Sequence, residues 1–240
     1  MSGHSKWKNI MHKKEKTDAQ RAKVFTKVGK EISIAVREGG PDPTSNTKLR
    51  DLISKAKSLN VPNDNIKRII DKAGADDVIY EEYTYEGYGP AGVAVIVTTA
   101  TDKKTRTAGN VRHYFDKFGG NMGTQGCVSF MFSDQGLIVI NNEDGDYDED
   151  KVMEDALEAG AADFIADGDL FEIYTEPDDL GAVKSALEGK YTLDSAEVTK
   201  VPSSYVTLEN EDDIKNMTLL LEHLDDCDDV SEVYHNWENE

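Results

Sequence analysis

The residues best suited to chemistry stand near the start of the chain, in the segment GHSKWKNIMHKKEK, residues 3–16. The segment holds five lysines and one glutamate, although the whole chain has a formal net charge of −20. Lysine side chains hold phosphate groups by charge, and an exposed aromatic ring such as that of Trp7 can stack on an unpaired base. This composition predicts a basic arm that binds nucleic acid and becomes ordered on binding. The alternative is a basic tail with Trp7 packed on the neighbouring helices.

The predicted contact surface continues along the first helix, where a basic stripe lies opposite the apolar stripe. Alone, such a stripe would be an ordinary solvated face, but its place directly after the arm favours a shared partner. The candidate nucleic-acid-binding residues are His4, Ser5, Lys6, Trp7, Lys8, Lys13, Lys14, Lys16, Arg21, Lys23, Lys27, Lys30 and Arg37.

The charge of the chain is divided by sign. Residues 1–75 carry a net charge of +9, and residues 76–240 carry −29. An asymmetry of this kind points to an interaction surface on one segment. The acidic balance of the whole chain therefore does not exclude a polyanionic partner, provided that the partner meets the basic end.

A second group of cations interrupts the acidic part, along a helix predicted over 103–118. These residues are Lys103, Arg106, Asn110, His113 and Lys117. Pairing with nearby carboxylates is the favoured interpretation. The alternative is a second anion contact, close to a helix N-terminus that already favours negative charge.

The third predicted helix exposes Lys67, Arg68 and Lys72, which suit phosphate groups. It lacks the array of glutamine and asparagine side chains that reads base edges. We therefore expect contacts to the nucleic-acid backbone rather than sequence-specific readout in the major groove. These residues do not distinguish DNA from structured RNA.

Enzymatic and metal-binding interpretations find little support. The sequence has no G-x-S-x-G, H-E-x-x-H or C-x-x-C motif, and its histidines lack metal-ligand spacing. Cys127 with His113 as a base would lack a family signature. The run DGDYDED resembles the start of a calcium loop, but Glu149 stands where glycine is required. We predict no enzyme, no cofactor and no metal, and explain the run as acids in the first turn of a helix.

Composition also limits the location and assembly of the protein. The longest apolar run, Val93–Val97, is far shorter than the ~18–20 residues that cross a bilayer. Cys127 and Cys227 form no motif, which is typical of reduced thiols. We therefore predict a cytoplasmic protein with no membrane partner, taken as a monomer by default.

Apolar spacings of three and four predict three helices after Asp18. The first ends at Gly39-Gly40-Pro41, the second is expected to be capped by Thr47, and the third by Asn63. Residues 1–77 are thus predicted to form a basic arm and an all-helical domain.

After this domain the pattern changes to short strands. EEYTYEGYG, GVAVIVTTAT, the helix at 103–118 and GCVSFMF give an incomplete β-β-α-β layer, with Val128, Phe130 and Phe132 expected on one face of the last strand. Residues 134–208 give a complete β-α-β-β-α-β order, which is ferredoxin-like. The helix and strand within 209–240 would complete the first layer.

The expected class is therefore α+β, with an all-helical N-terminal domain and two ferredoxin-like sandwich lobes, one inserted in the other. The inserted lobe would span 134–208, and the discontinuous domain 78–133 plus 209–240. The glycine-dense loops at 85–92 and 119–126 match no phosphate-binding motif, so tight turns or close approaches of backbone are expected there.

The segments GHSKW, FTKVGKEI, GGPDP, YEGYGP, GGNMG and VYHN together resemble the YebC/PmpR family, which includes mitochondrial translational activators. The resemblance runs nearly from end to end. It implies three lobes and a non-enzymatic role in gene expression, as a DNA-binding transcriptional regulator or as a factor acting on ribosomes. It also places residues 3–7 in a signature arm. Lys8 departs from the family, which often has a small residue there.

Overall fold

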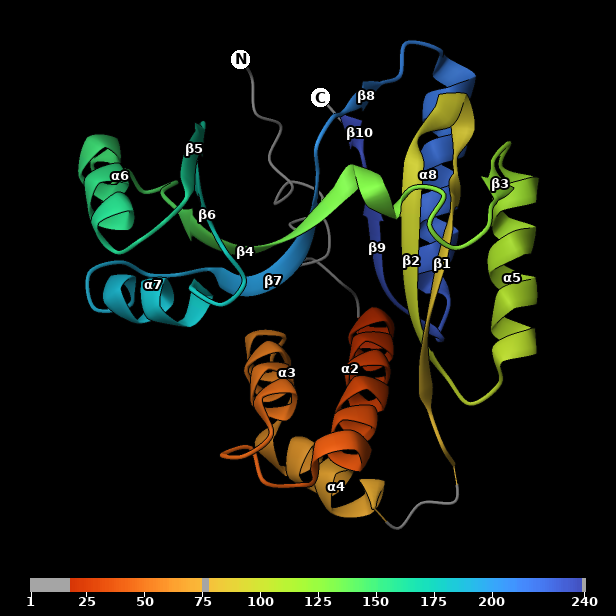
Figure 1. The fold of residues 1–240 in the computed structure, drawn as a ribbon, viewed down its shortest axis with the longest axis horizontal. Helices are drawn as coiled ribbons and strands as arrows, with labels where there is room; N and C mark the ends of the chain where they lie inside the picture. Colours follow the sequence, from red (N-terminus) through yellow and green to blue (C-terminus); the bar gives the residue numbers. More distant parts are fainter. Residues whose placement is uncertain (1–17, 75–77, 239–240) are drawn as a thin grey trace. The chain divides into compact units, whose positions relative to one another are not determined.

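The computed structural model describes residues 18–74 and 78–238. The described residues form two units. One combines 18–74, 78–131 and 202–238, and the other is the segment 132–201. The first unit contains a helical region, a four-stranded sheet and a two-stranded sheet of β8 (Val206–Thr207) and β10 (Trp237–Glu238), and the second contains a sheet with two helices (Figure 1). The predicted α+β class is confirmed.

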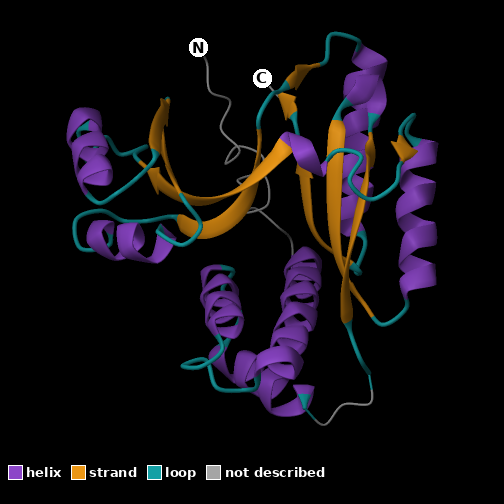
Figure 2. Cartoon of the chain, viewed as in Figure 1, coloured by secondary structure: helices purple, strands orange, loops and turns teal. Residues whose placement is uncertain are grey.

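The helical region consists of α2 (Asp18–Gly39), α3 (Thr47–Ser58) and α4 (Asn63–Ala73), visible in Figure 2. The predicted apolar stripes meet in one core, because a helix presents positions three and four apart on the same side. The buried members of this core are Val28, Ile32, Ala35, Val36, Leu49, Ala56, Val61, Ile66 and Ala73.

Both predicted caps in this region were wrong. Asn46, not Thr47, caps α3: its side chain accepts a hydrogen bond from the backbone of Leu49 at 3.0 Å. The Asn46 amide also donates to the carbonyl oxygen of Ala35 at 2.7 Å, which fastens the turn to α2. Asn63 lies inside α4, and Pro62 occupies the cap position without a side-chain bond. An amide suits this position better than a hydroxyl, because its NH2 group donates two hydrogen bonds, to Ala35 and Gly40, while its oxygen accepts the third, whereas a hydroxyl has a single donor.

The sheet of the first unit has the order β3-β1-β2-β9, so its edge strand comes from the C-terminal segment. Two helices cover one face, where Val95 and Val97 meet Phe115 and Leu220 in a single core. The helix α2 contacts β2 and β9. The elements are β1 (Glu81–Tyr88), β2 (Ala94–Thr101), β3 (Asn121–Met122), β9 (Val230–His235), α5 (Lys104–Lys117) and α8 (Glu211–Asp226).

The strand predicted at GCVSFMF was wrong. Ser129–Met131 form a single 3₁₀ turn, and 76% of the surface of Phe130 is exposed. The cause is Glu86, whose buried carboxylate accepts three backbone N–H bonds at 2.8–2.9 Å, from Gly126, Val128 and Ser129. Backbone donors that bind a side chain cannot also join a strand ladder.

The glycine-dense loops allow close approach of backbone, as expected. A Cβ atom at Gly87 would lie 2.5 Å from the carbonyl oxygen of Asn121, and one at Gly120 would lie 2.6 Å from that of Tyr88. Both distances are shorter than any ordinary carbon–oxygen contact. The two loops are therefore packing elements that hold β1 against β3.

The second unit contains β4 (Phe132–Asn141), α6 (Glu149–Glu158), β5 (Asp163–Asp167), β6 (Leu170–Thr175), α7 (Leu180–Leu187) and β7 (Ser195–Pro202). Its sheet order is β5-β6-β4-β7, so the first and third strands of the unit lie at the centre, as in the ferredoxin-like arrangement. Both helices pack on one core, which includes Ile138, Ile173, Val152 and Val183.

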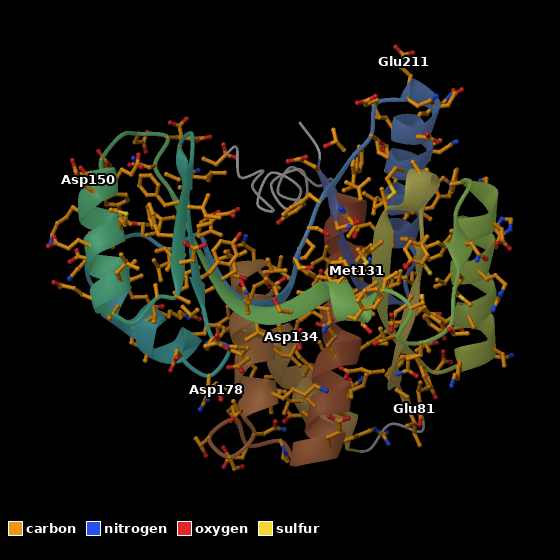
Figure 3. The ribbon with its side chains drawn as sticks, turned by 45° about the horizontal axis from the view of Figure 1, so that its top comes forward. Glu81, Met131, Asp134, Asp150, Asp178 and Glu211 are labelled. Carbon is orange, nitrogen blue, oxygen red and sulfur yellow. The ribbon has the colours of Figure 1, made fainter. Side chains whose placement is uncertain are left out.

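Acidic side chains gather at the N-terminal ends of α6 and α8. Asp150 projects from the first turn of α6 and Glu211 from that of α8 (Figure 3). Asp148 caps α6 by accepting from the backbone of Lys151 at 3.0 Å. The negative charges offset the positive ends of these helices, as the DGDYDED run predicts.

Glu86 provides a test of the loop that it holds. Burial alone would raise the pKa of this carboxyl, but the backbone N–H bonds from 126–129 lower it below the usual range. We expect Glu86→Gln to destabilise the protein by about 2 kcal/mol, because buried N–H groups lose a charged acceptor. Urea unfolding and amide exchange at Val128 and Ser129 measure this. Glu81→Gln, an exposed carboxylate of the same strand, is the control; equal stability of the two variants would contradict the role of Glu86.

Candidate nucleic-acid interface

The predicted arm lies outside the described residues, so its contact residues stay predictions. They are His4, Ser5, Lys6, Trp7, Lys8, Lys13, Lys14 and Lys16. Arg21 belongs to α2, but its side chain also lies outside the description. The structure does describe the remaining candidates on α2 and α5.

The basic stripe of α2 is not a solvated face, which corrects the expectation from the sequence. Lys27 and Lys30 are only 8% and 9% exposed. Lys30 Nζ lies 2.8 Å from Asp229 Oδ1 and donates to the carbonyl oxygen of Asp228 at 2.8 Å. Lys27 and Lys23 pair with Asp225 and Asp226, respectively. The segment 225–229, which comprises the last two residues of α8 and the three residues after it, thus neutralises the stripe.

The end of α8 is well suited to receive these lysines. The last carbonyl groups of a helix carry partial negative charge and lack partners within the helix. Lys27 donates to the carbonyl oxygen of Asp225, and Lys23 to that of Asp226. Two sources of negative charge, the aspartates and the helix end, therefore act on the same stripe.

Asp229 joins three elements at one buried carboxylate. Besides Lys30, it accepts from Arg106 Nη2 at 2.8 Å and from Thr107 Oγ1 at 2.8 Å. Burial alone would raise the pKa of Asp229, but the bonds from Lys30, Arg106 and Thr107 outweigh it and lower the pKa to about 2. The helical region and the sheet lobe are thus linked by charge.

The cations of α5 divide into one internal group and an outward face. Arg106 pairs with Asp102 at 2.7 Å and with Asp229, so the favoured interpretation of pairing is correct for this residue. The other four candidates are exposed, as is Arg112, which the sequence analysis missed. We call Lys103, Asn110, Arg112, His113 and Lys117 the α5 face.

Between residues 103 and 117, Asp116 is the one acid beside five lysines and arginines. Within residues 18–74 and 78–238, no ion pair joins Lys103, Arg112 or Lys117 to a carboxylate. Lys104, also missed, stacks over the ring of Tyr83 with Nζ 4.4 Å from the ring centroid. A helical wheel of 103–118 would have found Arg112, at the margin of the exposed side.

Three exposed cations of the helical region lie on α4. Lys67, Arg68 and Lys72 are exposed, and Arg68 donates to the side chain of Asn65 at 3.0 Å. On α3, Arg50 and Lys57 are exposed as well, whereas Lys48 pairs with Glu38 and Glu82, and Lys55 pairs with Glu31 and Glu232. Arg37, at the end of α2, donates to the carbonyl oxygen of Val78 at 3.3 Å.

A cleft of about 430 Å³ lies where α2 meets α5 and α8. It contains Lys23, Lys27, Tyr114 and His223, together with three carboxylates. Cys127 lies elsewhere, in the loop held by Glu86; burial, and then the Glu86 carboxylate, raise the pKa of its thiol. A raised pKa lowers the thiolate fraction, which disfavours a nucleophilic role for Cys127.

No group of three or more histidine, cysteine or acidic side chains in the described part of the chain could hold a metal ion. No helix there is long and apolar enough to cross a membrane.

The architecture defines a class of α+β proteins in which three helices precede a sheet lobe that the C-terminal segment completes, with a second sheet lobe inserted between these two parts in the sequence. The chain belongs to the TACO1/YebC family: residues 5–76 match its N-terminal domain, and residues 80–237 match its second and third domains.

Relatives are similar over the full length. A protein of Agathobacter rectalis named "Probable transcriptional regulatory protein" is 56% identical, covering 99% of this chain and 100% of its own. One of Acetivibrio thermocellus with the same name is 54% identical, with 100% of both covered. The crystal structure of the conserved hypothetical protein Aq1575 from Aquifex aeolicus is 42% identical, with a TM-score of 0.86 over 98% of this chain and 97% of that one.

The role of the buried Asp229 carboxylate can be tested by the stability of a variant that lacks its charge. Asp229→Asn leaves Lys30 and Arg106 without their buried counter-charge, and we expect a loss of about 3 kcal/mol at pH 7 in urea unfolding. Asp228→Asn, an exposed neighbour, is the matched control, and a similar loss there would contradict the assignment.

The pH dependence follows from the lowered pKa. Because the folded value of about 2 lies below the ordinary 3.8, Asp229 stabilises the folded protein by about 2 kcal/mol above pH 4. This contribution is lost as the pH falls from 4 towards 2. The difference in the free energy of unfolding between the wild type and the Asp229→Asn variant should therefore shrink as the pH falls over that range.

Proposed function

We propose that this protein is a non-enzymatic, nucleic-acid-binding regulator of gene expression that grips the phosphate backbone through its N-terminal arm. DNA is the partner that the names of the relatives suggest, through transcription. The proposal rests on one observation above others: the α5 face and α4 keep exposed cations in a molecule whose net charge is −20.

Three of the predicted phosphate contacts are used within the protein. Lys23, Lys27 and Lys30 pair with aspartates of the segment 225–229, so we assign them no phosphate contact in this arrangement. The arm remains the first contact, with Trp7 stacking on an unpaired base. The α5 face and the exposed cations of α4 provide further phosphate contacts.

The exposed groups favour backbone contacts over base readout. On α4 they are Lys67, Arg68 and Lys72, whereas Asn65 is held by Arg68. Lysine and arginine on a helix surface neutralise phosphates without regard to sequence, whereas paired amide contacts would select adenine. Weak discrimination among sequences is the expected behaviour.

A second candidate function is a ribosome-associated translation factor that binds ribosomal RNA. The observation that favours it is the net charge of −29 on residues 76–240, which a long bare duplex would repel. A cleft in a folded RNA could accept the basic end while leaving the acidic lobes in solvent. The same arm serves both functions, so the partner distinguishes them.

Removing residues 1–16 tests the arm. With about five phosphates neutralised, the affinity of the intact chain for duplex should fall by roughly two to three decades between 50 and 200 mM salt. The shortened chain should bind more weakly and lose most of that salt dependence. Gel shifts on duplex DNA and sedimentation of ribosomes through gradients at both salt concentrations measure the two partners in parallel.

The outcomes separate the alternatives. A shift on one duplex that survives competitor DNA supports transcription, and salt-sensitive sedimentation with ribosomes without a shift supports translation. If the deletion changes neither assay, the arm is not the contact and the proposal fails.

Lys117→Glu tests the α5 face. Reversing a phosphate-contacting charge should weaken binding by about tenfold and reduce the salt slope by about one. Lys215→Glu is the matched control, because Lys215 is an exposed lysine on α8 and the change in net charge is identical. Equal effects of the two substitutions would show that only net charge matters and would remove the α5 face from the interface.

A further inference from the structure

The sheet of the second unit has two differently composed faces. Its two helices, α6 and α7, both pack on the first face, as Figure 1 shows. The second face carries its own apolar cluster, in which Leu137 and Val139 are 1% and 0% exposed and Leu170 and Tyr174 are also buried. Because neither helix of the unit lies on this face, its deep burial indicates that another segment covers it.

The second face is acidic as well as apolar. Side chains alternate along a strand, so Glu172 lies between Leu170 and Tyr174 on this face of β6. On β5, Asp163 and Asp167 flank Ile165, and on β7 Glu197 lies on the side of Val201. The same alternation places no lysine, arginine or histidine on this face. We call Asp163, Asp167, Glu172 and Glu197 with the apolar cluster the acidic sheet face.

Glu172 is the most informative member. It is only 2% exposed, and the Tyr174 hydroxyl donates to its carboxylate at 2.6 Å. A carboxylate at this depth is stabilised by positive charge close by, since removing it from water is costly. The chemistry that fits this face is therefore a segment that carries both cations and large apolar side chains.

We propose that the acidic sheet face is the docking site of the chain's own N-terminal arm. Residues 3–16 combine five lysines with Trp7, Ile10 and Met11, which matches the mixture of carboxylates and apolar side chains on the face. The 17 residues before α2 can extend to about 60 Å, which is ample for a return to a neighbouring lobe.

Docking makes the face an internal competitor of nucleic acid, and this part of the inference rests on the proposed function. The face offers carboxylates to the same lysines that would neutralise phosphates. A tethered competitor acts at an effective concentration in the millimolar range, without a second molecule. Nucleic acid must therefore displace the face before it can hold the arm.

Zero-length carbodiimide cross-linking of the full chain, without nucleic acid, tests the docking. This reagent joins an amine and a carboxylate only where they touch. We expect amides between arm lysines and Asp167 or Glu197 in the monomer band, diminishing at 0.5 M salt because partly exposed pairs are screened. Cross-links of the arm to other carboxylates, or cross-links of the face only in a dimer band, would overturn the docking.

The variant Asp167→Asn/Glu197→Gln tests the competition. Both side chains are partly exposed, so the fold should survive. If nine in ten molecules are docked, releasing the arm raises the apparent affinity for nucleic acid about tenfold. The control Glu143→Gln/Glu158→Gln makes the same charge change at exposed sites of the same unit.

The two experiments fail in distinguishable ways. Absent cross-links refute the docking whatever the arm does to nucleic acid. If the cross-links form but neither double variant changes the affinity for nucleic acid, the docking stands. The competition is then refuted, and with it the role of the arm in binding nucleic acid.

Discussion

The buried carboxylate of Asp229 is the interaction on which the arrangement of the first unit depends. It binds Lys30 of α2 and Arg106 of α5 at the same time, and β9 begins at the next residue. Three segments that are far apart in the sequence therefore meet at one charge. Separating the helical region from the sheet would leave a buried charge without its counter-ion, which is costly. The two parts should therefore form and unfold together.

This constraint gives the acidity of the chain a structural role. Asp225, Asp226 and Asp229 neutralise the lysines of the α2 stripe, so the exposed cations that we assign to binding lie on α4 and α5. The molecule thus separates structural cations from available ones. Salt screens exposed charges far more than buried ones, so ionic strength that releases a polyanion leaves the Lys30–Asp229 pair intact. Added salt should therefore weaken the binding of a polyanion without unfolding the protein.

The sequence predicts the helices and strands well, but it does not predict which distant residues contact them. Periods of 3.6 and 2 are local, so the helices, the ferredoxin-like strand order and the core of α2–α4 could be predicted. A helical wheel shows that Lys27 and Lys30 lie opposite an apolar stripe, but not that residues 198 or 199 positions later cover them. The same limit explains the strand wrongly predicted at 126–132, because Glu86 acts from another strand. For the candidate site, residue types could be predicted, but which cations stay exposed could not.

The pairing of β2 with β9 has a consequence for biosynthesis. Ile96 lies opposite Tyr234, so the central strand of the first sheet waits for almost the whole chain to be translated. The segment 132–201 contains all of its own strands and leaves the ribosome earlier. Domains fold as units during synthesis, so the lobe formed by 132–201 should fold before the lobe formed by the segments on either side of it in the sequence. Until then, the Val95 side of β2 is exposed apolar surface, which makes this interval the one in which a nascent chain most needs a chaperone.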